Sequence, residues 1–199
     1  MFYTIEGIDG AGCGTVRRAL EKRLAASGKK FQSLKYPVPN LPFGEIIYKF
    51  LDGKLDIKPE IQFLAFVGQM ILEKERLKKL RKDILIVDRY LPCTLVFQGA
   101  KGFSIRKGLE FARLFEVEKP NKIFLLLVPW QIGYQRKNAE KRPSDLHEKD
   151  TSLYKKTAQI YNRLAKKNIL GQWKIIDATR SVDTIADEIF DIILKDSKK

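Results

Sequence analysis

The sequence predicts an α/β fold in which about five parallel strands form one sheet with helices on both faces. Short apolar runs alternate along the chain with stretches of helical spacing, which is typical of a parallel sheet connected by helices. Two runs, 83–87 and 122–128, are almost entirely apolar, as expected of strands covered on both faces. A glycine-rich segment, 7–15, separates the first strand from the first helix.

The expected elements follow one another in a regular order. Residues 2–5 form a strand, and Val16, Leu20 and Leu24 mark the buried stripe of a helix over 16–26. A strand over 30–36 runs into a stiff loop with three prolines. The remaining expected elements are helices at 43–51 and 59–82, a strand at 83–87, helices at 91–100 and 104–117, a strand at 122–128, helices at 131–140 and 149–167, a strand at 173–176 and a helix at 182–194.

Length and composition bound the class of protein. The 199 residues suit one domain spanning 1–199, and two cysteines in unlike contexts do not suggest a disulfide. No apolar run approaches the roughly 20 residues that cross a bilayer, and the first residues lack the layout of a signal peptide. We therefore expect a soluble, cytoplasmic protein with no membrane partner.

The formal net charge is +14, which favours polyanionic partners such as nucleic acid or nucleotide phosphates. Most lysines, however, are interleaved with apolar residues at helical spacing, for example over 73–82 and 155–167, as on solvated helix faces. No platform of aromatic and basic residues and no recognition helix is evident. Nucleic acid is therefore an unlikely partner, and the charge alone identifies no function.

The glycine-rich segment has the layout that cradles phosphate. Glycines let backbone N–H groups surround an anion, and the following helix directs its positive end toward it. The spacing fits a P-loop, with a glycine, four residues and a second glycine, which favours a fold of the P-loop type. Cys13 stands where the lysine is expected, Gly14 stands where the metal-binding hydroxyl is expected, and Thr15 is one position late. On its own, the segment could also be an ordinary tight turn.

Ligands of such sheets bind beyond the carboxyl ends of the strands. Three segments should meet there: the glycine loop, Tyr36-Pro37 and Asp88-Arg89-Tyr90. An acidic residue such as Asp88 at the end of a buried strand commonly holds magnesium in this fold. Arg89 can donate two hydrogen bonds to a phosphate. Thr15 is a second candidate for magnesium.

At these positions the chain resembles the thymidylate kinase family. The matching segments are 5–12 (IEGIDGAG), 36–37 (YP), 63–66 (FLAF), 88–99 (DRYLPCTLVFQG), 111–113 (FAR), 119–121 (KPN) and Glu148. They span nearly the whole chain in the right order. The resemblance implies transfer of the γ-phosphate of ATP to dTMP, giving dTDP, with Mg²⁺ as cofactor and a homodimer as assembly.

The resemblance also implies a role for each matching residue. Asp9 would lie beside the sugar and the acceptor phosphate of dTMP, Arg89 would clamp that phosphate, and Phe66 would stack on thymine. The residues implied at the phosphates of ATP are Gly7, Gly10, Ala11, Gly12, Cys13, Gly14, Thr15 and Arg136. Those implied at dTMP are Asp9, Tyr36, Pro37, Phe66, Arg89, Cys93, Thr94, Gln98 and Glu148.

The family closes a basic lid on ATP, here expected as a short segment over about 137–148. Some members carry an arginine where this chain has Gly10, so the lid should supply the catalytic cation. Arg142 is the first candidate and Lys141 the second, with Arg136 and Lys137 just before them.

Four departures from the family pattern leave alternatives open. Cys13 and Gly14 change the phosphate loop, Pro39 replaces a phosphate-binding arginine, and Met70 replaces an arginine that contacts thymine. The chain could therefore be a kinase for another nucleoside monophosphate, or a nucleotide-binding protein that has lost its chemistry. Because Cys13 lies at a helix N-terminus, we also expect a lowered pKa for its thiol.

Overall fold

The computed structural model describes residues 1–139 and 151–197. Five strands form one parallel sheet in the order β2-β3-β1-β4-β5. They are β1 (Phe2–Gly7), β2 (Phe31–Lys35), β3 (Ile84–Asp88), β4 (Lys122–Leu127) and β5 (Gln172–Asp177). The predicted fold class is confirmed. Because β1 is central, the loop that follows it lies in the middle of the carboxyl edge.

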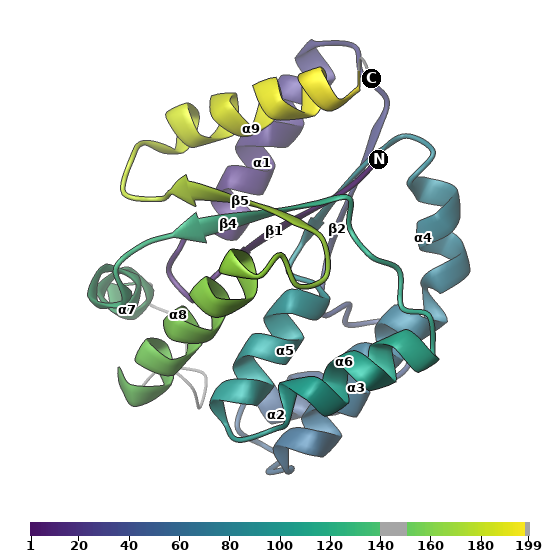
Figure 1. The fold of residues 1–199 in the computed structure, drawn as a ribbon, viewed down its shortest axis with the longest axis vertical. Coiled ribbons are helices and arrows are strands. Elements are labelled where there is room, and N and C mark those ends of the chain that lie inside the picture. The colour runs from purple at the N-terminus through teal and green to yellow at the C-terminus, as the bar shows by residue number, and fades with distance from the viewer. Residues whose placement is uncertain (140–150, 198–199) are drawn as a thin grey trace.

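Helices cover both faces of this sheet (Figure 1). They are α1 (Cys13–Ala26), α2 (Gly44–Leu51), α3 (Pro59–Leu72), α4 (Lys74–Leu80), α5 (Leu91–Ala100), α6 (Ile105–Leu114), α7 (Trp130–Ala139), α8 (Thr151–Lys166) and α9 (Val182–Asp196). One face carries α1 and α9, which pack against each other, and the other carries α5 between α3 and α8.

The expectation of one helix over 59–82 is wrong, because the helix is broken at Glu73 into α3 and α4. At the end of α3, the N–H of Glu73 donates to the carbonyl of Gln69. At the start of α4, the carbonyl of Glu73 accepts from the N–H of Leu77. No glycine or proline marks this break in the sequence, and both helices keep the same apolar spacing. Periodicity alone could not reveal it.

The buried strands divide the core into two clusters. In β3, Ile84 and Ile86 belong to the cluster that contains residues of α1 and α9, whereas Leu85 and Val87 face the cluster that contains residues of α3 and α5. Successive side chains of a strand point to opposite faces, so a strand covered on both sides must be apolar throughout. This explains why the two most apolar runs of the chain are β3 and β4.

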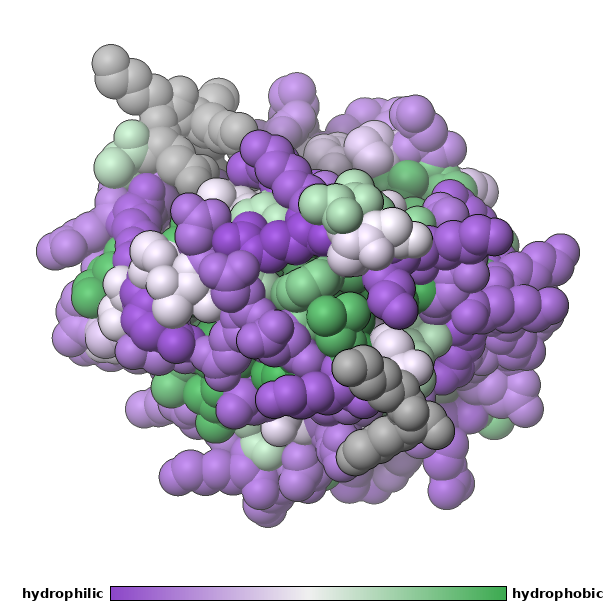
Figure 2. Space-filling view, turned by 90° about the horizontal axis from the view of Figure 1, so that it is seen from above, coloured by the Kyte–Doolittle hydropathy of each residue, from purple (hydrophilic) through white to green (hydrophobic). Residues whose placement is uncertain are grey.

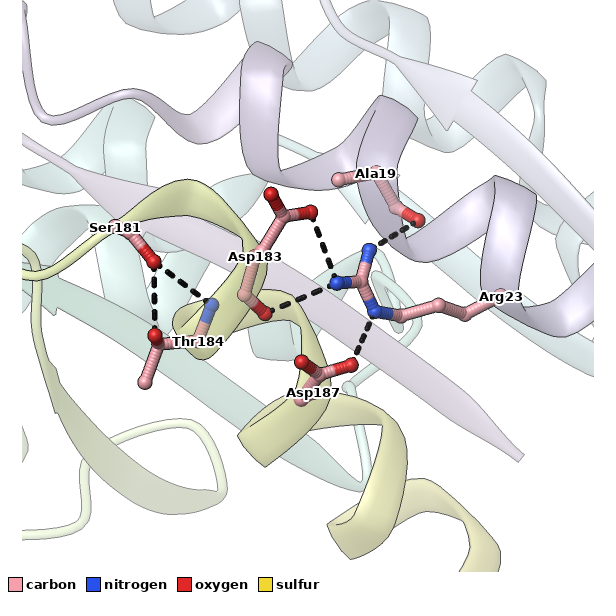
Figure 3. A network of polar contacts seen from close by, with 6 residues as sticks. All are labelled: Ala19, Arg23, Ser181, Asp183, Thr184 and Asp187. Carbon is pink, nitrogen blue, oxygen red and sulfur yellow. Dashed lines mark hydrogen bonds and ion pairs between the residues drawn. The ribbon is translucent and has the colours of Figure 1, made fainter.

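Polar contacts add to the apolar packing between α1 and α9 (Figure 3). The guanidinium of Arg23 donates to the carboxylates of Asp183, at 3.0 Å, and Asp187. It also donates to the carbonyl of Ala19 in its own helix at 3.1 Å. These contacts link the helix that follows the glycine loop to the last helix described.

Hydrophilic side chains cover most of the face seen from the side of α9 (Figure 2). Within residues 1–139 and 151–197, no helix is both long enough and apolar enough to cross a membrane.

Candidate active site

A cleft of about 570 Å³ opens at the carboxyl edge of the sheet. The glycine loop, Tyr36-Pro37 and Asp88-Arg89-Tyr90 all line it, so the three segments meet as the strand order predicts. Most of the residues expected at the two substrates border this one space: Asp9, Gly10, Ala11, Gly12, Cys13, Gly14, Thr15, Tyr36, Pro37, Phe66, Asp88, Arg89, Cys93, Thr94, Gln98 and Arg136. Gly7 lies at the base of the loop, and Lys141, Arg142 and Glu148 fall outside the described residues.

The glycine loop folds tightly, with the N–H of Ala11 donating to the carbonyl of Ile8 at 3.1 Å. Gly10 and Gly12 have φ values of +77° and +90°, a region that favours glycine. A Cβ added to Gly7 would lie 2.8 Å from the Cβ of Ala11, so the loop closes against its own base. No side chain caps α1 at Gly12. The N–H groups of the first turn can therefore receive an anion.

Helix α7 packs directly on this loop through two glycines. A Cβ added to Gly10 would overlap the carbonyl oxygen of Gly133 and lie 2.8 Å from its carbonyl carbon. The contact carries Arg136 and Lys137 of α7 to the border of the cleft. Arg136 donates to the carbonyl of Ala178 at 3.1 Å, which fixes its guanidinium beside the loop that follows β5.

Cys13 is part of the core and does not present a charge to the cleft. Its side chain is 4% exposed and packs within the cluster under α1. Burial raises the pKa of its thiol, and the nearby Arg89 only partly opposes this effect. The expectation of a lowered pKa is therefore wrong, because desolvation of the thiolate outweighs the helix N-terminus and the arginine.

Asp88 lies close to the position where a side chain of residue 14 would begin. Its carboxylate is 2% exposed, and Oδ2 would lie 3.3 Å from a Cβ on Gly14. Nε of Arg17 lies 3.6 Å from the same oxygen. Thr15 is exposed, and its hydroxyl accepts from Nη2 of Arg18 at 3.3 Å.

Magnesium is usually held in nucleotide sites by one or two carboxylates together with phosphate oxygens and water. The residues present fit this mode, because Asp88 offers one carboxylate at the phosphate loop and Gly14 places no side chain in front of it. Among the described residues, no group of three or more histidine, cysteine or acidic side chains could hold a metal ion by itself.

Arg89 supports the underside of the glycine loop. With φ at +65°, it turns back so that its guanidinium donates to the carbonyls of Gly7 and Ile8, the latter at 3.2 Å. It also donates to the carboxylate of Asp9 at 3.0 Å and lies 5.7 Å from the ring centre of Phe97. These contacts hold the loop and the end of β3 in a fixed relation.

Glu6 is a buried carboxyl that was not predicted from the sequence. Its Oε1 accepts from the N–H of Tyr90 at 3.0 Å, and its Oε2 accepts from the hydroxyl of Tyr161 at 3.3 Å. Burial raises its pKa to about 8, although Arg89 pulls in the opposite direction. The signal was present: Glu6 is the one charged residue in β1.

The other end of the cleft is mainly apolar, with a few polar groups. Phe66 and Met70 of α3 face Thr94 and Gln98 of α5 across the cleft. Gln98 is 2% exposed, and no donor among the described residues reaches its Oε1. A buried acceptor without a partner is costly, so this oxygen suits a donor on a bound ligand.

Gln69, also missed in the sequence, fixes the loop on this side. Its carboxamide accepts from the N–H of Val38 at 3.0 Å and donates to the carbonyl of the same residue at 2.7 Å. These two hydrogen bonds join α3 to the loop 36–39 beside Phe66 and Met70. An uncharged polar residue on the buried side of an apolar helix was the available signal.

The five-stranded parallel order, the glycine loop after β1 and the acidic residue ending β3 define a P-loop nucleotide kinase. The model of the family described as thymidylate kinase matches residues 5–189. The chain belongs to the thymidylate kinase family, whose members phosphorylate dTMP to dTDP with ATP as the phosphate donor.

Similar proteins support this membership across the full length of the chain. The chain is 28% identical to thymidylate kinase of Homo sapiens over 192 residues, covering 93% of this chain and 85% of the relative. It is 26% identical to thymidylate kinase of Thermomicrobium roseum over 209 residues, covering 100% and 96%. It is 29% identical to the probable thymidylate kinase of Thermococcus kodakarensis over 204 residues, covering 97% of each.

Proposed function

We propose that this protein transfers the γ-phosphate of ATP to dTMP and that one cleft holds both substrates. The observation that carries the proposal is that a single cleft has two chemically different ends. The backbone cradle of residues 10–15 forms one end, and an apolar slot with Phe66 and an unpartnered Gln98 forms the other. A nucleoside triphosphate and a nucleoside monophosphate can then meet between them.

The residues of this chain would act mainly by positioning, since phosphoryl transfer needs alignment and charge neutralisation. The N–H groups of the glycine loop would bind phosphate oxygens of ATP. Arg89 would hold the loop and Asp9 in line with the acceptor phosphate. Asp88 would hold Mg²⁺, which neutralises charge on the donor phosphates when bound.

The base of dTMP suits the apolar end of the cleft. Phe66 is partly exposed to the cleft and offers a ring for stacking. The N3–H of thymine would donate to Oε1 of Gln98, the buried acceptor that lacks a partner. Tyr36, Pro37, Cys93 and Thr94 complete the walls of this end.

Cations near the donor phosphates would come from α7 and the segment after it. Arg136 and Lys137 border the cleft, and we propose Arg142 and Lys141 as the lid cations that complete the site. Removing bulk water on closure would strengthen each of these charge contacts.

We also propose a cytoplasmic homodimer that buries the outer surfaces of α3 and α6. Both helices expose large apolar side chains: Ile61, Leu64 and Leu72 on α3, and Leu114 on α6, followed by Phe115. Isolated exposed apolar residues are ordinary, but a group on neighbouring helices is typical of an interface. Sedimentation of wild type and Leu64→Glu at the same concentration tests it: wild type should sediment as a dimer and the variant as a monomer.

The catalytic proposal is tested by ADP release with ATP, Mg²⁺ and each of dTMP, dUMP, dCMP, CMP, UMP and AMP. We expect dTMP to be the preferred acceptor and Arg89→Ala to abolish turnover. Arg106→Ala is the control, because Arg106 forms an exposed pair with Glu110 on α6. Preference for another acceptor would identify a kinase of different specificity, which the apolar Met70 allows.

A second candidate function follows from the core position of Cys13. With an uncharged residue there and no hydroxyl at Gly14, the protein could bind nucleotide without turning it over. ATP binding measured by calorimetry, together with no ADP release with any acceptor, would favour this candidate and contradict the kinase activity.

A further inference from the structure

We propose that Arg18 supplies the phosphate-binding cation that the glycine loop lacks at Cys13. The inference rests on the proposed function, since it assumes that phosphates of ATP occupy the cradle of residues 10–15. It assigns to this arginine of α1 the charge that a P-loop lysine supplies elsewhere.

Arg18 reaches back to the start of its helix. Side chains of a helix lean toward its N-terminus, and residues four apart lie on one side of it. Nη1 of Arg18 would accordingly lie 3.6 Å from a Cβ on Gly14, and Nη2 donates to the hydroxyl of Thr15 at 3.3 Å. Arg18 borders the cleft together with residues 12–15. Its guanidinium is therefore beside the N–H groups that would bind the anion.

Gly14 lies beside both Arg18 and Asp88. The position where a Cβ would stand lies 3.6 Å from Nη1 of Arg18 and 3.3 Å from Oδ2 of Asp88. A Cβ at position 14 would press on the carboxylate of Asp88 and make an ordinary van der Waals contact with Arg18. The position that lacks a hydroxyl and the guanidinium of Arg18 therefore lie side by side at the start of α1.

The charge of Arg18 is not neutralised by a carboxylate within the described part of the chain. Its neighbours on α1 differ in this respect. Arg17 pairs with Glu21, lies near Asp88 and donates to Ser33 at 3.0 Å. Arg23 pairs with two aspartates of α9. Arg18 can therefore turn its fork of donors toward a phosphate without giving up an ion pair, and such contacts are among the stronger hydrogen bonds.

Arg18→Gln tests the proposal, with Lys22→Gln as matched control. Lys22 lies one turn further along the same helix and is exposed, so its loss removes the same charge from α1 at a greater distance from the cradle. We expect Arg18→Gln to raise the Kd and the KM for ATP about 10- to 100-fold. The control should change them less than about twofold, and the KM for dTMP should stay near the wild-type value in both.

Two further measurements separate a phosphate contact from a structural role. Inorganic tripolyphosphate, which lacks the nucleoside, should lose affinity for Arg18→Gln in the same ratio as ATP. Arg18→Lys keeps the charge but loses the paired N–H donors of the guanidinium, so its Kd for ATP should lie between those of wild type and Arg18→Gln. Thermal melting of the three variants checks that each is folded.

Equal ATP and tripolyphosphate affinities in Arg18→Gln and Lys22→Gln would overturn the role of Arg18 and leave the kinase intact. ATP binding without turnover in the wild type would overturn the kinase, while the ratio of Kd values would still decide the role of Arg18. Failure of wild type to bind ATP or tripolyphosphate would overturn both.

Discussion

Gly10 of the glycine loop and Gly133 of α7 pack backbone to backbone, with no room for a side chain between them. A Cβ on Gly133 would in turn lie 2.8 Å from the carbonyl oxygen of Asp9. Because α7 is the last helix before residue 140 and carries Arg136 to the cleft, this contact couples the phosphate loop to the basic residues beside it. Two glycines far apart in sequence thus set the distance between the phosphate loop and α7, at the end of the cleft that would bind ATP.

Gly10→Ala should disturb that spacing as well as strain the loop. Gly28→Ala is the matched control, because Gly28 has a similar φ of +69° but nothing within 4 Å of an added Cβ. Left-handed strain alone costs about 1–2 kcal/mol, so we expect that loss of unfolding free energy in the control. Gly10→Ala should lose more free energy of unfolding than the control, as measured by urea unfolding. It should also raise the KM for ATP, as measured by steady-state kinetics. Equal behaviour of the two variants would contradict the coupling.

Gln69→Leu should weaken acceptor binding by releasing the loop 36–39. Gln62 offers the control, since it is a second buried glutamine on α3; its amide donates to the carbonyl of Ile57 at 2.6 Å and its oxygen accepts from Lys101, and neither partner lines the cleft. Both substitutions leave backbone groups unpaired and should cost about 1–3 kcal/mol of stability. Only Gln69→Leu should raise the KM for dTMP, by about tenfold, with a smaller effect on the KM for ATP. A similar rise in Gln62→Leu would assign the effect to general loss of stability.

Glu6 should make stability fall as the pH rises. Its pKa is about 8 in the folded protein and near its ordinary value of 4.5 when unfolded, so the folded state binds one more proton between these values. Stability from this group is therefore complete below pH 4.5 and is lost as the pH rises toward 8. From pH 5.5 to 8.5 the expected loss is about 3 kcal/mol, and Glu6→Gln should abolish it. Parallel unfolding profiles of the two proteins across this range would contradict the buried carboxyl.

The two cysteines should resist alkylation in the folded protein. Burial raises the pKa of Cys13, and it raises that of Cys93 to about 12, so few thiolates exist at pH 8. The thiolate is the reactive form, so iodoacetamide should label the native protein at least about 100-fold more slowly than the protein in guanidinium chloride. Rapid labelling of one thiol before unfolding would show a reactive cysteine and contradict its raised pKa.

The fold could be predicted from the sequence because its main signals are local. Apolar runs, helical spacing and a glycine loop identify strands, helices and the edge where they meet, and all five strands were located within two residues at each end. The break at Glu73 was not predicted, since nothing in the spacing interrupts the helical pattern there. The site was predictable to the extent that its residues follow strand ends.

What the sequence could not supply is where side chains point and how deeply they are buried. Cys13 was expected to be an activated thiol from its place at a helix start, yet its burial reverses the pKa shift. Glu6, Gln69 and Arg18 act through contacts with residues in other elements or one turn away. Such contacts depend on packing and rotamers, which a pattern of residue types does not specify.

The contact of α1 with α9 bears on how the protein is made. Leu20 and Leu24 of α1 share a core cluster with Ile185 and Ile189 of α9, and Arg23 bonds across the same interface. A ribosome releases α9 long after α1, so the helix that begins at the phosphate cradle stays without its outer partner during most of synthesis. Until then α1 can pack only on the sheet, and the part of its surface that α9 covers stays exposed.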